Sequence, residues 1–286
     1  MTVAEPVERH ILGLSPAGFH RNAYWEWASA REDARTLIAV HGLTRNGRDF
    51  DGVAQAVADE FHVICPDVVG RGFSERLSDA ALYGYPQYLA DQTALIARLD
   101  VEAVDWLGTS MGGLIGMMLA AQPGTPIRRL ILNDVGPFVP KAALERIASY
   151  VGHDPWFETI AELEGYLRRV HAPFGPLSDI EWAHLALWSA RSQTNGGFRL
   201  AYDPAIARAF DPPLNDVDLW SLWDRIACPV LIIRGALSDL LLSETAVEMV
   251  RRKPGTELVE FAGCGHAPAL FDPTQIAAIR DWLARS

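Results

Sequence analysis

The sequence predicts an α/β fold in which a mostly parallel sheet is covered by helices on both faces. Short apolar runs rich in Val and Ile recur along the chain, and each is followed by a turn residue and then by a stretch with helical spacing. These runs lack polar alternation, as expected for parallel strands buried on both faces. The alternation of runs and helices stops after Phe138 and resumes near Leu219. This break predicts an insertion into the sheet domain.

Six apolar runs are predicted to be parallel strands, at residues 36–40, 62–65, 104–107, 130–132, 230–233 and 258–261. The helical stretches between and after them are residues 47–59, 87–99, 111–121, 243–252 and 274–284. The last stretch places Ile276, Ile279 and Leu283 on one stripe that faces the core. Near the start, residues 7–14 and 19–28 alternate in polarity and predict an antiparallel pair at the sheet edge.

The segment at residues 138–218 has a helical, irregular pattern with many aromatic residues and no strand-like run. We therefore predict a helical cap inserted into a core domain formed by residues 1–137 and 219–286. Because the cap has no sheet of its own to cover, part of its aromatic surface is expected to line a pocket, and the alternative is packing against the core. The candidates for substrate contact are Trp156, Phe174 and Trp188, with Trp182 in the same aromatic set.

Composition excludes several classes of function. The chain has 36 acidic and 25 basic residues, a formal charge of -11, and no basic run, which disfavours nucleic acid as a partner. No stretch of about 18 apolar residues indicates a membrane span, and the first thirty residues lack the apolar core of a signal peptide, so a cytoplasmic location is expected. Three scattered cysteines without a CxxC pair argue against a disulfide framework or a zinc site.

The strongest local motif is Gly108-Thr109-Ser110-Met111-Gly112, between a predicted strand and a predicted helix. A sharp strand-to-helix turn strains its central residue and requires small neighbours, which Gly108 and Gly112 provide. The turn holds Ser110 at a helix N-terminus, where the dipole favours developing negative charge. Ser110 is therefore the predicted nucleophile, and the alternative is a glycine-rich turn with a capping serine.

A serine hydroxyl needs a base, and the base needs a carboxylate that fixes its tautomer. His266 follows the last predicted strand in a loop of small residues, which is the expected position for the base. Asp239, after the strand at 230–233, is the predicted acid, and Asp134, one strand earlier, is its rival. His171, in the cap, is open between a substrate-facing and a structural role.

Two backbone amides are expected to hold an oxyanion at this site. Met111 follows the nucleophile at the start of a helix and supplies one amide. Leu43 follows the strand at 36–40 in the turn His41-Gly42-Leu43 and supplies the other. His41 is then expected to brace this turn, since a second base is unnecessary.

With these motifs, the chain resembles the α/β-hydrolase family over nearly its whole length. The run from Asp67 to Ser74, Asp-Val-Val-Gly-Arg-Gly-Phe-Ser, is similar to the family's D-x-x-G-x-G-x-S loop. The resemblance implies an α/β-hydrolase fold with an eight-stranded, mostly parallel sheet, a Ser-His-Asp triad and neither metal nor other cofactor. One departure is that many members carry the acid three residues after the strand-end glycine, where this chain has Ser238, so Asp134 stays open.

Within the resemblance, bacterial serine carboxylesterases are the most similar group, and some of them accept aliphatic polyesters. We predict a carboxylic ester hydrolase for small or oligomeric esters. A carbon-carbon bond hydrolase and a binding-only receptor on the same fold are the alternatives. Arg45 and Arg71, on loops after strands, are expected near the pocket mouth, where they would tolerate a substrate carboxylate. The sequence is compatible with a homo-oligomer and does not indicate its size.

Overall fold

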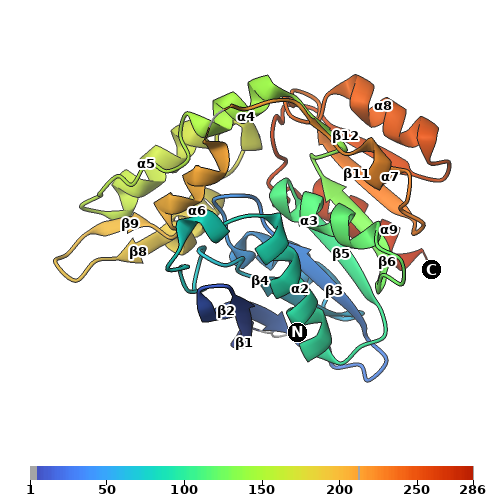
Figure 1. Cartoon of the computed structure of the whole chain (residues 1–286), viewed down its shortest axis with the longest axis horizontal. Coiled ribbons are helices and arrows are strands. Elements are labelled where there is room, and N and C mark those ends of the chain that lie inside the picture. The colour runs from blue at the N-terminus through green and yellow to red at the C-terminus, as the bar shows by residue number, and fades with distance from the viewer. Residues whose placement is uncertain (1–4, 212, 286) are drawn as a thin grey trace.

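Eight strands form one sheet in this computed structural model, which describes residues 5–211 and 213–285. Their order across the sheet is β1, β2, β4, β3, β5, β6, β11, β12 (Figure 1). The bounds are β1 Val7–Ser15, β2 Gly18–Trp27, β3 Arg35–Val40, β4 Phe61–Pro66, β5 Val104–Thr109, β6 Ile127–Asn133, β11 Val230–Gly235 and β12 Glu257–Phe261. Strand β2 is antiparallel to both β1 and β4, and the other neighbours are parallel. The predicted fold and the antiparallel edge pair are confirmed.

Helices cover both faces of the sheet and enclose two apolar cores. Alternate residues of β3 point to opposite cores, because Leu37 belongs to one and Ile38 to the other. The Leu37 core contains residues of α1 (Asp51–Val57) and α9 (Pro273–Ala284). The Ile38 core contains residues of α2 (Tyr85–Leu99), α3 (Met111–Ala120) and α8 (Ser243–Arg252). Short helices at η1 (Gly47–Phe50), η2 (Ala80–Leu82) and α7 (Trp220–Trp223) lie in the connections.

Strand β6 is longer than the apolar run from which it was predicted, because the polar residues at its start form hydrogen bonds. Strand β6 begins at Ile127, three residues before its apolar run, and includes Arg128 and Arg129. The Arg128 guanidinium donates to the Asp105 carboxylate on β5 at 2.9 Å, and Arg129 donates to the Leu283 carbonyl at 2.9 Å. These contacts extend a strand beyond what hydrophobicity alone indicates.

The segment at residues 138–218 lies outside the eight-stranded sheet (Figure 1). At its base, β7 (Phe138–Val139) pairs antiparallel with β10 (Val217–Asp218), so the chain leaves and rejoins the core at one place. Between them lie α4 Lys141–Ala148, α5 Ile160–Val170, η3 Ala172–Phe174, α6 Asp179–Ser189, β8 Ala190–Ser192, β9 Phe198–Leu200 and η4 Pro204–Phe210. The expectation of a segment without strands is wrong at β7, β8, β9 and β10, each of which has two or three residues and is too short to show a periodicity. The division into core and cap stays a prediction, and residues 1–4, 212 and 286 lie outside the described residues.

The turn from β5 to α3 is the place where backbone segments approach most closely. A Cβ added at Gly108 would lie 2.3 Å from the carbonyl of Gly112, and one added at Gly112 would lie 2.0 Å from the Val40 carbonyl oxygen. Between these glycines, Ser110 has φ 52° and ψ -114°, a conformation that costs a non-glycine residue free energy. Packing of α3 against β3 and β5 therefore depends on both glycines.

We predict that Gly108→Ala lowers the free energy of unfolding by about 2 kcal/mol or more, because its methyl group must displace backbone. Gly165→Ala is the control: Gly165 lies within α5, and an added Cβ would approach only the Arg169 side chain, at 3.8 Å. This control should gain about 0.5–1 kcal/mol from its helix position. Urea unfolding measures both changes. Equal stability of Gly108→Ala and wild type would contradict the close approach.

Candidate active site

Ser110, His266 and Asp134 form a hydrogen-bonded chain at the carboxyl edge of the sheet. The Ser110 Oγ lies 2.9 Å from His266 Nε2, and His266 Nδ1 lies 2.7 Å from Asp134 Oδ2. Ser110 follows β5, Asp134 follows β6, and His266 lies in the loop after β12. Parallel strands bring their carboxyl ends to one edge, which is why three distant segments meet here.

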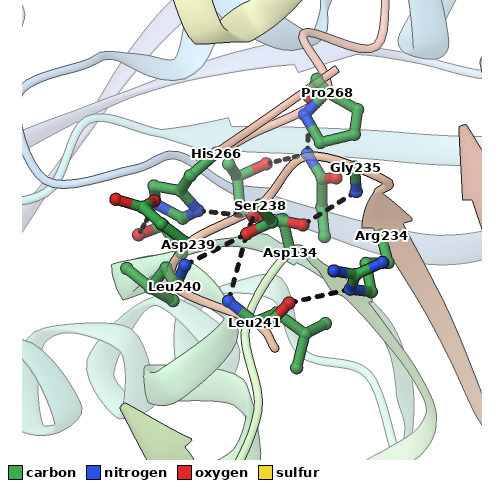
Figure 2. Close-up of polar contacts among 12 residues, drawn as sticks. Asp134, Arg234, Gly235, Ser238, Asp239, Leu240, Leu241, His266 and Pro268 are labelled. Carbon is green, nitrogen blue, oxygen red and sulfur yellow. Dashed lines mark hydrogen bonds and ion pairs between the residues drawn. The ribbon is translucent and has the colours of Figure 1, made fainter. Parts of the chain in front are cut away.

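Asp134 is fully buried, and its carboxylate accepts hydrogen bonds from three groups in two segments, the end of β11 with its following loop and the loop after β12 (Figure 2). The Ser238 hydroxyl donates to Oδ2 at 2.5 Å, the Gly235 amide donates to Oδ1 at 2.8 Å, and His266 donates from Nδ1. An ionised carboxylate only accepts, so Nδ1 carries the imidazole proton in this arrangement. Nε2 is then left to accept the proton of the Ser110 hydroxyl, as a general base must.

Asp239 does not contact His266, so the expectation that it orients the imidazole is wrong. Its side chain is 49% exposed and forms a two-point ion pair with Arg146 of α4, whose Nη2 donates to Oδ1 at 2.8 Å. The loop after β11 turns Ser238 inward to Asp134 and Asp239 outward to Arg146. The sequence signal for this was the serine at the position that usually carries the acid.

Leu43 and Met111 both lie at Ser110, and their amides are available to a ligand. Leu43 follows β3 and lines the cavity that contains Ser110, and Met111 is the first residue of α3. Within residues 5–211 and 213–285, neither backbone N–H donates to another group of the protein. A helix N-terminus also carries partial positive charge. Two free donors beside a serine are what an oxyanion needs, so the predicted use of both amides stands as a proposal.

His41 braces the turn that carries Leu43. The Val68 amide donates to its Nε2 at 2.9 Å, so Nδ1 carries the proton and donates to the Gly42 carbonyl at 2.6 Å. Burial lowers the pKa of His41 to about 3, which keeps the ring neutral. The expected structural role of His41 agrees with these contacts.

A cavity of about 60 Å³ lies between the 138–218 segment and the sheet edge and contains both Ser110 and His266. Of the three predicted substrate-contacting aromatics, Phe174 lines it. Trp156 and Trp188 do not, and these two predictions are wrong. Trp156 is 50% exposed and donates to the Gly196 carbonyl, whereas Trp188 packs its ring on the Arg48 guanidinium at 3.8 Å.

Several polar residues line the cavity, and sequence analysis had pointed to only some of them. His171 stacks on Phe174 with ring centroids 4.5 Å apart, and burial holds its pKa well below the ordinary value, so it is a neutral ring. Arg146 and Tyr150, after β7, also line the cavity and had no sequence signal. Arg45 lines it as expected and is paired with Asp49 at 2.7 Å.

Arg71 is not at the pocket mouth, contrary to expectation. Its side chain is fully buried, and it is not among the residues that line the cavity. Among the described residues, no group of three or more His, Cys, Asp or Glu side chains is arranged to hold a metal ion, and no helix is long and apolar enough to cross a membrane. Independence from metals therefore stays a prediction.

The comparisons with known proteins agree with this fold. Residues 37–279 match the model of the alpha/beta hydrolase family. A 3-hydroxybutyrate-oligomer hydrolase of Cupriavidus necator is 48% identical over 283 residues, which cover 96% of each chain. An alpha/beta hydrolase structure from Novosphingobium aromaticivorans is 37% identical, covers 99% of each chain and has a TM-score of 0.88. A putative hydrolase from Rickettsia typhi is 32% identical over 99% of this chain and 100% of its own, with a TM-score of 0.91.

The chain belongs to the α/β-hydrolase family. Its reaction class is that of a carboxylic ester hydrolase, as the sequence predicted.

The hydrogen bond from His266 to Asp134 predicts which carboxylate matters for turnover. Asp134→Asn should lower kcat on the order of 10³- to 10⁴-fold, because an amide facing Nδ1 favours the wrong imidazole tautomer. Asp239→Asn is the matched control, since it makes the same change at a partly exposed carboxylate that pairs with Arg146 and not with His266. Its kcat should stay within about tenfold of wild type. Steady-state hydrolysis of a chromogenic ester measures both. The reverse order of effects would assign the acid to the loop after β11.

The low pKa of His41 predicts a pH-dependent contribution to stability. Unfolded His41 takes up a proton below its ordinary pKa of about 6.5, whereas the folded ring stays neutral down to about 3. The unfolded state then binds more protons, so stability falls as the pH falls. The stability advantage of wild type over His41→Gln should be about 1.4 kcal/mol smaller at pH 5.5 than at pH 7.5. Urea unfolding at both pH values measures it; a difference that does not change with pH would contradict a neutral buried ring.

Proposed function

We propose that Ser110, His266 and Asp134 are the catalytic triad and that the Leu43 and Met111 amides are the oxyanion hole. The observation that carries this proposal is the hydrogen-bonded chain from Ser110 Oγ through His266 to a buried carboxylate. In the first half-reaction, Ser110 Oγ bonds to the acyl carbon while His266 Nε2 takes its proton. The ester carbonyl electrons move to oxygen, which the two amides hold. Collapse of this intermediate expels the alcohol, which receives the proton from His266.

The second half-reaction repeats the first with water. His266 Nε2 takes a proton from water, the hydroxyl bonds to the acyl carbon, and the Ser110 oxygen leaves with the proton returned by His266. The products are a carboxylic acid and the free enzyme. Asp134 keeps its negative charge throughout and stabilises the imidazolium that forms in each step. No step requires an oxidant, a metal or a cofactor.

The substrate that we propose is a short oligomeric hydroxyalkanoate ester. The relative from Cupriavidus necator is named for hydrolysis of 3-hydroxybutyrate oligomers and matches this chain over nearly its whole length. Such an oligomer carries a free carboxylate. The cavity is lined by two arginines, Arg45 and Arg146, whose positive charge favours a substrate carboxylate. A cytoplasmic location, where such oligomers would be met, stays a prediction.

We predict that Ser110→Ala lowers kcat by several orders of magnitude at unchanged stability, because the nucleophile is lost while binding contacts stay. In wild type, an alkyl fluorophosphonate should add one adduct at Ser110, observed by intact mass and peptide mapping. Ser238→Ala controls for loss of a serine elsewhere at the site and should leave that adduct in place. An adduct on another residue, or a Ser110→Ala enzyme of full activity, would contradict the triad.

The substrate proposal is tested with the same protein. Linear dimers and trimers of 3-hydroxybutyrate should show kcat/KM values above those of acetyl esters, and a vinylogous diketone should show none. The methyl ester of each oligomer, which lacks the free carboxylate, should have a KM raised by about tenfold. Faster cleavage of the diketone would favour a carbon-carbon bond hydrolase. Stoichiometric ligand binding without turnover would favour a receptor.

A further inference from the structure

Arg71 is a buried cation that neither the triad nor the cavity accounts for. It lies in the loop after β4, its side chain is fully buried, and it pairs with no carboxylate among residues 5–211 and 213–285. A buried charge without a counter-ion is costly and persists only where hydrogen bonds satisfy it. Its Nη1 donates to the Val69 carbonyl at 2.7 Å and to the Tyr88 hydroxyl at 3.1 Å.

The remaining donors of Arg71 reach the two residues proposed to hold the oxyanion. Its Nε donates to the Leu43 carbonyl at 2.9 Å, and its Nη2 lies 3.7 Å from Met111 Sδ. The rings of Tyr83 and Tyr88 pack near the guanidinium, with centroids 5.7 and 5.0 Å from Cζ. One planar, immobilised group therefore contacts the Leu43 carbonyl and the Met111 sulfur, which belong to the two residues whose amides are proposed to hold the oxyanion.

We propose that Arg71 is a positioning residue that fixes the distance and direction between the Leu43 and Met111 amides. This inference rests on the proposed function, because it concerns the oxyanion hole of that reaction. Leu43 belongs to the loop after β3 and Met111 to the start of α3, so the two donors lie on separate elements far apart in sequence. A shift of about 1 Å between such groups costs on the order of 100-fold in rate.

The geometry of the side chain explains why arginine occupies this place. The guanidinium is a rigid fork that donates in several fixed directions, whereas a lysine ammonium is a compact charge on a flexible stem. Only the fork reaches Leu43 and Met111 at once while it also bonds Val69 and Tyr88. Its field extends to the Leu43 turn, because the pKa of His41, lowered mainly by burial, is lowered further by the charge of Arg71. The same positive field favours a negative oxygen beside that turn.

The test compares Arg71→Lys and Arg71→Met with a matched control, Arg48→Lys. Arg48 is also a buried arginine that packs on an aromatic ring, Trp188, but it pairs with Asp51 and contacts neither Leu43 nor Met111. Both Arg71 variants should lose roughly 10- to 100-fold in kcat with KM within about threefold, because ground-state binding does not use the oxyanion contacts. The control should keep kcat within about threefold at a comparable loss of thermal stability.

A second readout isolates the oxyanion. An alkyl trifluoromethyl ketone bonds to Ser110 Oγ through its carbonyl carbon, and its oxygen becomes an alkoxide held by the two amides. Its Ki should rise in the Arg71 variants by the same factor by which kcat/KM falls, as for a transition-state analogue. The Ki of the carboxylate product should stay within about threefold of wild type. A purely structural defect would weaken both ligands alike.

The outcomes separate this inference from the function beneath it. A wild-type enzyme that hydrolyses esters and binds the ketone at Ser110, with folded Arg71 variants that equal it in kcat and ketone affinity, overturns the inference alone. Equal losses in Arg48→Lys also overturn it. A wild-type enzyme that neither hydrolyses esters nor binds the ketone at Ser110 overturns the proposed function itself. If the Arg71 variants do not fold, Met111→Leu removes the sulfur contact alone; it should weaken the ketone several-fold, and unchanged affinity would overturn the inference.

Discussion

The site is organised around one buried carboxylate, Asp134. A carboxylate removed from water is stable only if its oxygens accept hydrogen bonds, and Asp134 accepts them from Gly235, Ser238 and His266. The donors lie at the end of β11, in the loop after it and in the loop after β12, so the hydrogen bonds to this one carboxylate fix both loops together. The orientation of His266 toward Ser110 follows from that constraint.

Hydrogen bonds of Asn133 also hold the segments that carry Ser110 and His266. Asn133, the residue before Asp134, donates from Nδ2 to the Thr109 hydroxyl at 3.0 Å and to the Pro268 carbonyl at 2.9 Å. These bonds join the turn that carries Ser110 to the loop that carries His266. The geometry of the proposed triad therefore depends on two fully buried side chains, Asn133 and Asp134, whose hydrogen bonds hold the neighbouring loops in place.

The loop after β4 supports the turn that carries Leu43, because Val68 donates to His41 and Arg71 donates to the Leu43 carbonyl. Asp67 is buried there and accepts from the Gly47 and Phe73 amides at 2.7 and 2.8 Å, and burial raises its pKa to about 7. The D-x-x-G-x-G-x-S run, which the sequence showed only as a motif of the family, thus holds the loop after β3 in place through hydrogen bonds from Asp67. Its arginine is the member that reaches across to the proposed oxyanion hole.

Sequence reasoning found the strands, the helices and the places of Ser110 and His266, because each depends on a local pattern of apolar residues and glycines. It chose Asp239 over Asp134 as the partner of His266, and the structure places Asp134 there instead. Both follow strands, and only the direction in which each backbone turns its side chain separates them. Trp156 and Trp188 were misplaced for the same reason, since aromatic content does not say which way a ring points. Burial of Arg71 was likewise not predicted, because three of its partners, Leu43, Tyr88 and Met111, lie in segments distant in sequence.

The orientation of His266 toward Ser110 depends most on the hydrogen bond from its Nδ1 to Asp134, and proton NMR observes the hydrogen in that bond directly. A hydrogen shared between an imidazole and a buried carboxylate resonates far downfield of the amide region. We predict such a resonance in wild type and in Asp239→Asn, and its loss in Asp134→Asn. A resonance that persists in a folded Asp134→Asn protein and disappears in Asp239→Asn would contradict it.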